Sequence, residues 1–130
     1  MRAILAVSIL MASALTVPAV AGEPTRSAQF EECSNAPNST TYSLRECYGA
    51  ELKRQDARLN AAYAEALSTI DSAGKLKLRA AQRAWITFRD ADCQAVFASY
   101  GGTMAPMMED QCQLDRTSQR ADDLEQFAKP

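Results

Sequence analysis

The chain has 130 residues, with 14 basic and 16 acidic side chains, no histidine and four cysteines. This length fits one domain, and the slightly acidic balance argues against nucleic acids and anionic membranes as partners. Because the chain has neither histidine nor a Cys-x-x-Cys pair, the sequence disfavours zinc binding and thioredoxin-like redox chemistry. We therefore expect no metal and no other cofactor.

The first 21 residues have the layout of a secretory signal peptide. Arg2 supplies a positive charge, an uncharged and mainly apolar run extends from Ala3 to Val17, and small residues precede an expected cleavage site after Ala21. A membrane anchor is the alternative, but the run is shorter than the roughly 20 residues that a spanning helix needs. No cysteine follows the cleavage site directly, so a lipid anchor is not indicated. We expect a periplasmic or secreted protein that is not held in a membrane after cleavage.

All four cysteines lie beyond the expected signal peptide, and an even number in an exported domain indicates two disulfides. Folding the chain about Gly101–Gly102 brings Cys93 and Cys112 nearly level on neighbouring helices, which favours that pair. Cys33 then pairs with Cys47. A bond between Cys47 and Cys93 is the main alternative.

The next segment, residues 22–40, is rich in Gly, Pro, Ser, Thr and Asn, which predicts a loop-like leader anchored at Cys33. A helical domain is expected over residues 41–130. Its first helix is predicted to begin at a capping box formed by Ser43 and Glu46. Apolar side chains three and four residues apart then continue the helical pattern to about residue 70.

Two further helices follow in the pattern. Residues 71–74 interrupt the first apolar stripe, a second stripe runs to Tyr100, and Gly101–Gly102 ends it. Pro106 is then predicted to lie in the first turn of a third helix. No segment shows the alternation of a strand. The sequence predicts an all-α fold, a small three-helix antiparallel bundle stabilised by two disulfides after a cleaved signal peptide.

Two polar clusters stand out on the first two long helices. Counting back from the turn between them places Asp56 level with Arg89, Asn60 level with Trp85, and Tyr63 level with Gln82. We interpret the clusters as a polar seam that fixes the register of the two helices; a ligand or catalytic pocket is the alternative. The residues of this structural motif are Asp56, Asn60, Tyr63, Gln82, Arg83, Trp85, Arg89 and Asp90.

Catalysis is not expected from these clusters. An acid–base pair of Asp56 and Asp90 is conceivable, but a position opposite Arg89 would lower the pKa of Asp56 and make it a poor general acid. Without histidine, and with the cysteines oxidised, no nucleophile–base pair is visible. We predict a protein that is not an enzyme.

Several motifs together resemble the LprI-type lysozyme inhibitor family, over roughly residues 33–127. The resemblance implies a small helical exported domain that binds a protein partner. It implies no particular inhibitory residue. The motifs that carry it are Asp56-x-x-Leu59-Asn60-x-x-Tyr63, Gln82-Arg83-x-Trp85-x-x-x-Arg89-Asp90-x-x-Cys93, Gly101-Gly102-Thr103 and Cys112-x-x-x-x-Thr117-x-x-Arg120-x-x-x-Leu124.

The turn before the last helix is the candidate binding loop. A lysozyme inhibitor would present a rigid loop to a cleft that holds an acidic catalytic pair. In such a complex Thr103 and the glycine N–H groups would be donors, with apolar anchors beside them. An ordinary interhelix turn with core methionines is the alternative. The candidate residues are Tyr100, Gly101, Gly102, Thr103, Met104 and Met107.

The sequence thus predicts an exported, non-catalytic binding protein that resembles a lysozyme inhibitor and protects peptidoglycan by occluding the lysozyme cleft. The alternative is a periplasmic envelope interaction or structural protein that has another partner and no effect on lysozyme.

Overall fold

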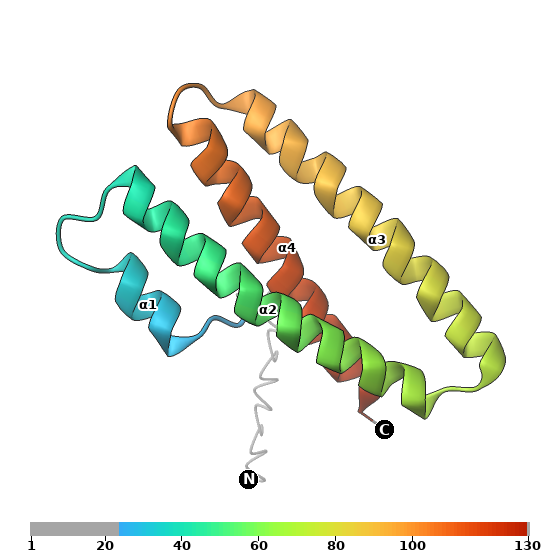
Figure 1. The fold of residues 1–130 in the computed structure, drawn as a ribbon. Coiled ribbons are helices and arrows are strands. Elements are labelled where there is room, and N and C mark those ends of the chain that lie inside the picture. The colour runs from blue at the N-terminus through green and yellow to red at the C-terminus, as the bar shows by residue number, and fades with distance from the viewer. Residues whose placement is uncertain (1–23, 130) are drawn as a thin grey trace, which may run out of the picture.

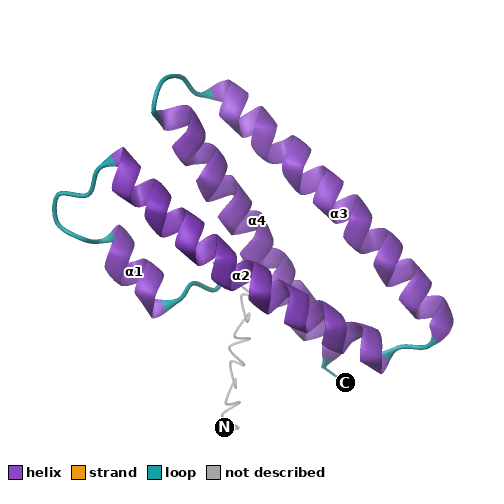
Figure 2. Cartoon of the chain, in the orientation of Figure 1, coloured by secondary structure: helices purple, strands orange, loops and turns teal. Residues whose placement is uncertain are grey.

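A computed structural model describes residues 24–129 (Figure 1). Within that range the chain forms four α-helices and no strand, as Figure 2 shows. The predicted all-α class is therefore confirmed. The expected signal peptide lies outside the described residues. None of the four helices is both long and apolar enough to cross a membrane.

The four helices are one short and three long ones. Their bounds are α1 Ala28–Ser34, α2 Thr41–Thr69, α3 Ser72–Ser99 and α4 Met104–Ala128. The three long helices match the three predicted from the sequence. The expectation of a loop-like leader is wrong for α1, which makes the number of helices four rather than three.

Helix α1 forms because its first turn is capped and its apolar side chain is buried. The Ser27 hydroxyl accepts a hydrogen bond from the backbone N–H of Phe30 at 3.1 Å, which satisfies one of the free donors at the helix start. The Phe30 ring is buried against Cys47 and Leu114. A single aromatic residue in a polar segment gives no helical periodicity, so the sequence did not reveal this helix.

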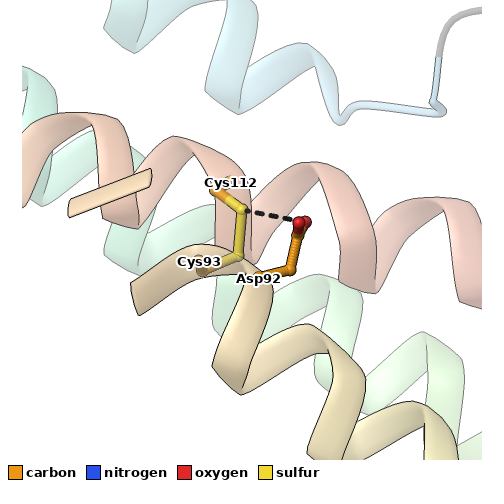
Figure 3. A group of neighbouring side chains, drawn as sticks. All are labelled: Asp92, Cys93 and Cys112. Atoms are coloured by element: carbon orange, nitrogen blue, oxygen red, sulfur yellow. Dashed lines mark hydrogen bonds between the residues drawn. A yellow bond between two sulfur atoms is a disulfide. The ribbon is translucent and has the colours of Figure 1, made fainter. Parts of the chain in front are cut away.

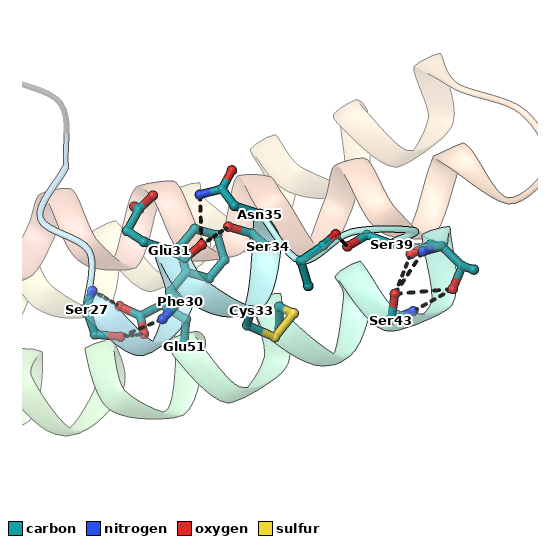
Figure 4. The surroundings of a disulfide bond; sticks show 12 residues. Ser27, Phe30, Glu31, Cys33, Ser34, Asn35, Ser39, Ser43 and Glu51 are labelled. Carbon is teal, nitrogen blue, oxygen red and sulfur yellow. Dashed lines mark hydrogen bonds between the residues drawn. A yellow bond between two sulfur atoms is a disulfide. The ribbon is translucent and has the colours of Figure 1, made fainter.

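Helix α2 begins one turn before the predicted capping box. Thr40 is the N-cap, and its reciprocal partner is Ser43. Figure 4 shows Ser43 at the start of α2. The Thr40 hydroxyl accepts from the backbone N–H of Ser43 at 3.1 Å, and the Ser43 hydroxyl accepts from the backbone N–H of Thr40 at 2.9 Å. The Ser43–Glu46 box was wrong because two overlapping segments have the same spacing and the earlier one caps the helix.

Helix α4 lies between α2 and α3 and contacts both, whereas α2 and α3 hardly approach each other. In Figure 1, α2 and α4 run in the same direction and α3 runs antiparallel to them. Helix α1 lies against α2 on the side away from α3. The bundle is therefore organised around α4, its last helix.

Two small apolar clusters flank a polar middle. The first joins α2, α3 and α4 near the α2–α3 turn and contains Leu59, Ala62, Ala66, Leu78, Ala121 and Leu124. The second joins α1, α2 and α4 through Phe30, Cys47 and Leu114. Buried polar residues lie on α2 and α4, among them Glu51, Gln55, Thr117 and Ser118. So small an apolar core gives the two disulfides a large share of the stability.

An arginine of α2 ties that helix to α4. The half-buried Arg58 forms an ion pair with Asp122, and its Nε lies 2.6 Å from Glu125 Oε1. Arg58 also donates to the side-chain oxygen of Gln55 at 2.9 Å. Partners on three sides hold the guanidinium in one orientation, which helps to set the register of the two parallel helices.

Candidate functional site

The candidate site is the end of the α3–α4 hairpin, which we call the tip and define as residues 100–104. Helix α3 ends at Ser99, and Tyr100 continues in an extended conformation. Gly102 has a φ of 57°, the left-handed region in which glycine is favoured, and this lets the chain reverse within four residues. The tip arises from local backbone chemistry, as the two glycines predicted.

The tip presents a polar hydroxyl between two exposed apolar side chains. The side chains of Tyr100 and Met104 are 46% and 42% exposed. Thr103 is the N-cap residue of α4, but within the described structure its hydroxyl makes no capping hydrogen bond, so it remains open to another partner. Met107, which was expected to be an anchor, is only partly exposed on the first turns of α4.

A disulfide fixes the two helices that carry the tip. Cys93 of α3 and Cys112 of α4 are bonded, with their Cα atoms 5.5 Å apart, and Cys93 has no exposed surface. The pairing predicted from the spacing is confirmed, as is the pair of Cys33 and Cys47. The bond prevents α3 and α4 from separating behind the tip.

Asp92 lies beside this disulfide, as Figure 3 shows. One carboxylate oxygen of Asp92 is 3.9 Å from the sulfur of Cys112. The three side chains Asp92, Cys93 and Cys112 are close enough to surround a cation. Both sulfurs are consumed in the disulfide, however, and cysteine binds a metal as a free thiolate, so the donor set does not fit a metal.

An open groove of about 530 Å³ runs between α3 and α4 behind the tip. Tyr100, the residue that follows α3, also lines this groove and therefore belongs to both the tip and the groove. Its lining includes the apolar side chains of Val96 and Met108 and the charged side chains of Asp92, Asp115 and Arg116. The groove combines apolar surface with charged groups, which is typical of a site that holds a long polar side chain.

The charges in the groove are paired across helices. Both Nε and Nη2 of Arg116 lie 2.9 Å from the Asp92 carboxylate, and its guanidinium also lies 5.8 Å from the centre of the Phe88 ring. Asp115 forms an ion pair with Arg26, from the segment before α1. Burial raises the pKa of the Asp115 carboxyl, and the positive charges of Arg26 and Arg116 offset this only in part.

The segment that supplies Arg26 is held by a buried carboxylate on α2. The backbone N–H and hydroxyl of Ser27 donate to Glu51 at 2.8 and 2.5 Å (Figure 4). Gln55 and Arg54 donate to the same carboxylate at 2.8 and 2.7 Å. Burial alone would raise the pKa of Glu51, but these hydrogen bonds outweigh it and lower the pKa to about 2. The fully buried Glu51 is therefore ionised at neutral pH.

The predicted polar seam between α2 and α3 is wrong. Arg89 does not pair with Asp56. It pairs instead with Asp90 at 2.9 Å, donates to Thr117 of α4 at 3.4 Å, and stacks 5.1 Å from the ring centre of Trp85. The prediction assumed that successive helices face each other, whereas α4 lies between α2 and α3.

The remaining seam residues also have other roles. Gln82 accepts a hydrogen bond from Arg120 of α4 at 3.0 Å. Tyr63 packs against the apolar cluster near the α2–α3 turn. Asn60 and Arg83 are exposed.

The pKa of the Asp56 carboxyl also differs from the expectation. Burial raises the pKa of its carboxyl, and the positive charge of Arg89 opposes this only in part. The lowered pKa expected from a direct pair with Arg89 is therefore wrong.

Comparison with known proteins identifies the family of this chain. A family model described as "Lysozyme inhibitor LprI" matches residues 33–124. This chain belongs to the LprI family. It is also 32% identical over 126 residues to an uncharacterized protein of Rhizobium meliloti (strain 1021), and the match covers 86% of each chain. No solved structure matches the chain.

For this LprI family member, the tip was predictable from the amino-acid sequence, whereas the groove was not. The polar groove residues Asp92, Asp115 and Arg116 come from two helices and have no motif spacing. One signal was present: Asp92 interrupts the apolar stripe of the second predicted helix. A charged residue at a core-facing position indicates either a partner or a site, and here it has a partner in Arg116.

Proposed function

We propose that this protein is a non-catalytic lysozyme inhibitor that inserts its tip into the enzyme's cleft. The observation that carries this proposal is the exposed tip, with the Cys93–Cys112 bond holding its two helices together about two helical turns behind it. Rigidity matters because a loop that is already ordered loses little conformational entropy on binding. The family description, which names lysozyme inhibitors, agrees with this role.

The chemistry of the tip suits a cleft that holds carboxylates. A lysozyme cleft contains two acidic catalytic residues, and one of them is ionised during the reaction. The unengaged Thr103 hydroxyl and the N–H groups of Gly101 and Gly102 can donate to such carboxylates. Tyr100 and Met104 on either side would exclude water from these hydrogen bonds.

Exposed apolar side chains also lie away from the tip. Among the described residues, Leu76, Ile86, Phe88 and Phe97 are exposed on α3, Tyr42 on α2 and Phe127 on α4. A helix advances by roughly 100° per residue, which places Phe88 on a different side of α3 from Ile86 and Phe97. These side chains are spread over three helices, whereas the tip gathers Tyr100, Thr103 and Met104 within one turn, so we favour the tip as the binding surface over the envelope-partner alternative. We infer a periplasmic or secreted protein, since peptidoglycan and lysozyme meet there.

The test measures whether the oxidised protein, comprising residues 22–130, inhibits the lysis of cell walls by lysozyme. Saturable inhibition of a basic animal-type lysozyme is expected, with loss of inhibition after reduction and alkylation. Thr103→Val removes the hydroxyl without changing shape, and Met104→Ala removes an anchor; each should weaken inhibition about tenfold.

The matched control is Leu76→Ala, because Leu76 is 67% exposed at the opposite end of the bundle. This variant should inhibit as well as the wild type. If the wild type at large molar excess inhibits no lysozyme from several classes, the proposal is wrong and the envelope-partner alternative stands.

A further inference from the structure

We infer that the groove between α3 and α4 is a second contact with the lysozyme and takes one of that enzyme's arginine or lysine side chains. This inference rests on the proposed function, because it concerns the partner that the tip binds. It adds a site next to the tip and assigns that site a ligand of stated chemistry.

The position of the groove supports a shared partner. Tyr100 lines the groove and is also part of the tip, so a protein seated on the tip covers the end of the groove as well. The opposite walls come from α3 and α4, which the Cys93–Cys112 bond holds together. The groove is therefore preformed and needs no opening before it can bind.

The charges in the groove favour a cation over an anion. Its lining includes two carboxylates, Asp92 and Asp115, and one guanidinium, Arg116. Arg116 is engaged by Asp92 through two nitrogens and lies near the ring of Phe88. Asp92 and Arg116 therefore compensate each other, and the charged group that remains in the lining is the Asp115 carboxylate, which Arg26 contacts through Oδ1.

Asp115 is the group that an incoming cation would meet. Its side chain is 43% exposed, although it pairs with Arg26, and one carboxylate can accept hydrogen bonds from two donors. The aliphatic part of a lysine or arginine would lie along Val96 and Met108, which line the same groove. Animal-type lysozymes are basic proteins, so their surfaces offer such side chains.

The cleanest test adds a positive charge to the groove without removing any ion pair. Ser99 lines the groove, and its hydroxyl only donates to the backbone carbonyl of Ala95 within α3, at 2.8 Å. Ser99→Lys should weaken binding to a basic animal-type lysozyme at least about tenfold by repulsion between like charges. The effect should shrink in high salt.

Ser68→Lys is the matched control. Ser68 is exposed near the end of α2, and its hydroxyl donates to the carbonyl of Glu65 at 2.7 Å, as Ser99 does on α3. It lies at the other end of the molecule from the tip. This variant should bind lysozyme within about twofold of the wild type.

Asp115→Asn provides an independent test, with Asp123→Asn as its control on the same helix. Asp115→Asn should weaken binding about tenfold, whereas Asp123→Asn should leave it unchanged. Far-ultraviolet circular dichroism and thermal unfolding establish that each variant is folded.

The outcomes separate this inference from the proposed function. If Thr103→Val weakens inhibition while Ser99→Lys and Asp115→Asn do not, the tip binds lysozyme and the groove inference is wrong. If Ser99→Lys strengthens binding, the groove takes an acidic group and the inference is also wrong. If the wild type inhibits no lysozyme, the proposed function fails first, and the inference fails with it.

Discussion

Cys93 and Cys112 bond α3 to α4 behind the tip, and the 19-residue separation between them encloses every residue of the tip. A closed loop of this size restricts the unfolded chain and contributes about 3 kcal/mol to stability. The same bond also limits the motion of the tip in the folded protein. Cys33 and Cys47 enclose a loop of similar size, with a separation of 14 residues, but at the other side of α2.

The two disulfides are therefore predicted to contribute similarly to the stability of the protein, whereas only the Cys93–Cys112 bond is predicted to matter for inhibition. Replacing either pair by serine should lower the free energy of unfolding by about 2–4 kcal/mol. Only Cys93→Ser with Cys112→Ser should also abolish lysozyme inhibition under conditions where the variant is folded. Chemical unfolding and inhibition assays on both double variants check this. Equal loss of inhibition in the two would contradict a role for the Cys93–Cys112 bond at the tip.

The adjacent glycines of the tip are predicted to respond differently to alanine. Gly102 has a positive φ, whereas Gly101 does not, and a Cβ at either position would meet no atom within 4 Å. Gly102→Ala should cost about 1 kcal/mol of stability and distort the tip, while Gly101→Ala should be neutral. Thermal unfolding of the two variants measures the difference, and equal stabilities would show that the left-handed turn is not needed.

Glu51 is predicted to make the stability depend on acid pH. Its folded pKa of about 2 lies below the value of about 4.3 that an unfolded glutamate has. A carboxyl with a lowered folded pKa stabilises the protein above its unfolded pKa. That contribution is lost as the pH falls from about 4.3 through about 2.

The test of Glu51 compares Glu51→Gln with Glu65→Gln, a change at an exposed position of the same helix. Glu51→Gln should lower stability at pH 7 by about 2–3 kcal/mol, because the amide cannot accept all the hydrogen bonds that the carboxylate accepts. It should also flatten the fall in stability between pH 4.3 and 2. Urea unfolding across this range measures both effects; parallel pH curves for Glu51→Gln and the wild type would exclude Glu51 as the source.

Asp56 is predicted to behave in the opposite way. Burial raises the pKa of its carboxyl, so at pH 7 the ionised side chain costs the folded state free energy. Asp56→Asn should therefore leave the protein at least as stable as the wild type at pH 7, with the difference shrinking as the pH falls and Asp56 takes up a proton. A loss of more than about 1 kcal/mol on urea unfolding at pH 7 would instead indicate a direct pair with Arg89.

The local parts of this fold were predictable, whereas the neighbours of each helix were not. Apolar spacing located the three long helices, and counting about Gly101–Gly102 paired Cys93 with Cys112 correctly. The same counting failed for Asp56 and Arg89, because spacing gives the level of a residue along a helix but not which helix faces it. Helix α4 comes last in the chain yet lies between the other two.

The candidate site shows the same difference: the tip was predictable from the sequence, whereas the groove was not. The tip is a local feature, and the glycines and Pro106 mark it in the sequence. The groove depends on pairing across helices, such as Arg116 with Asp92 and Arg26 with Asp115. Arg26 and Asp115 are 89 positions apart, and nothing in the sequence links them. This surface therefore becomes visible only in the folded structure.

The central claim, insertion of the tip into the lysozyme cleft, is tested most directly by steady-state kinetics with a soluble oligosaccharide substrate. A basic animal-type lysozyme is titrated with the oxidised protein at several substrate concentrations. Occlusion of the cleft predicts a rising apparent KM with unchanged kcat, and a weaker effect from Met104→Ala. A falling kcat with unchanged KM would place the contact outside the cleft and contradict the proposed mechanism.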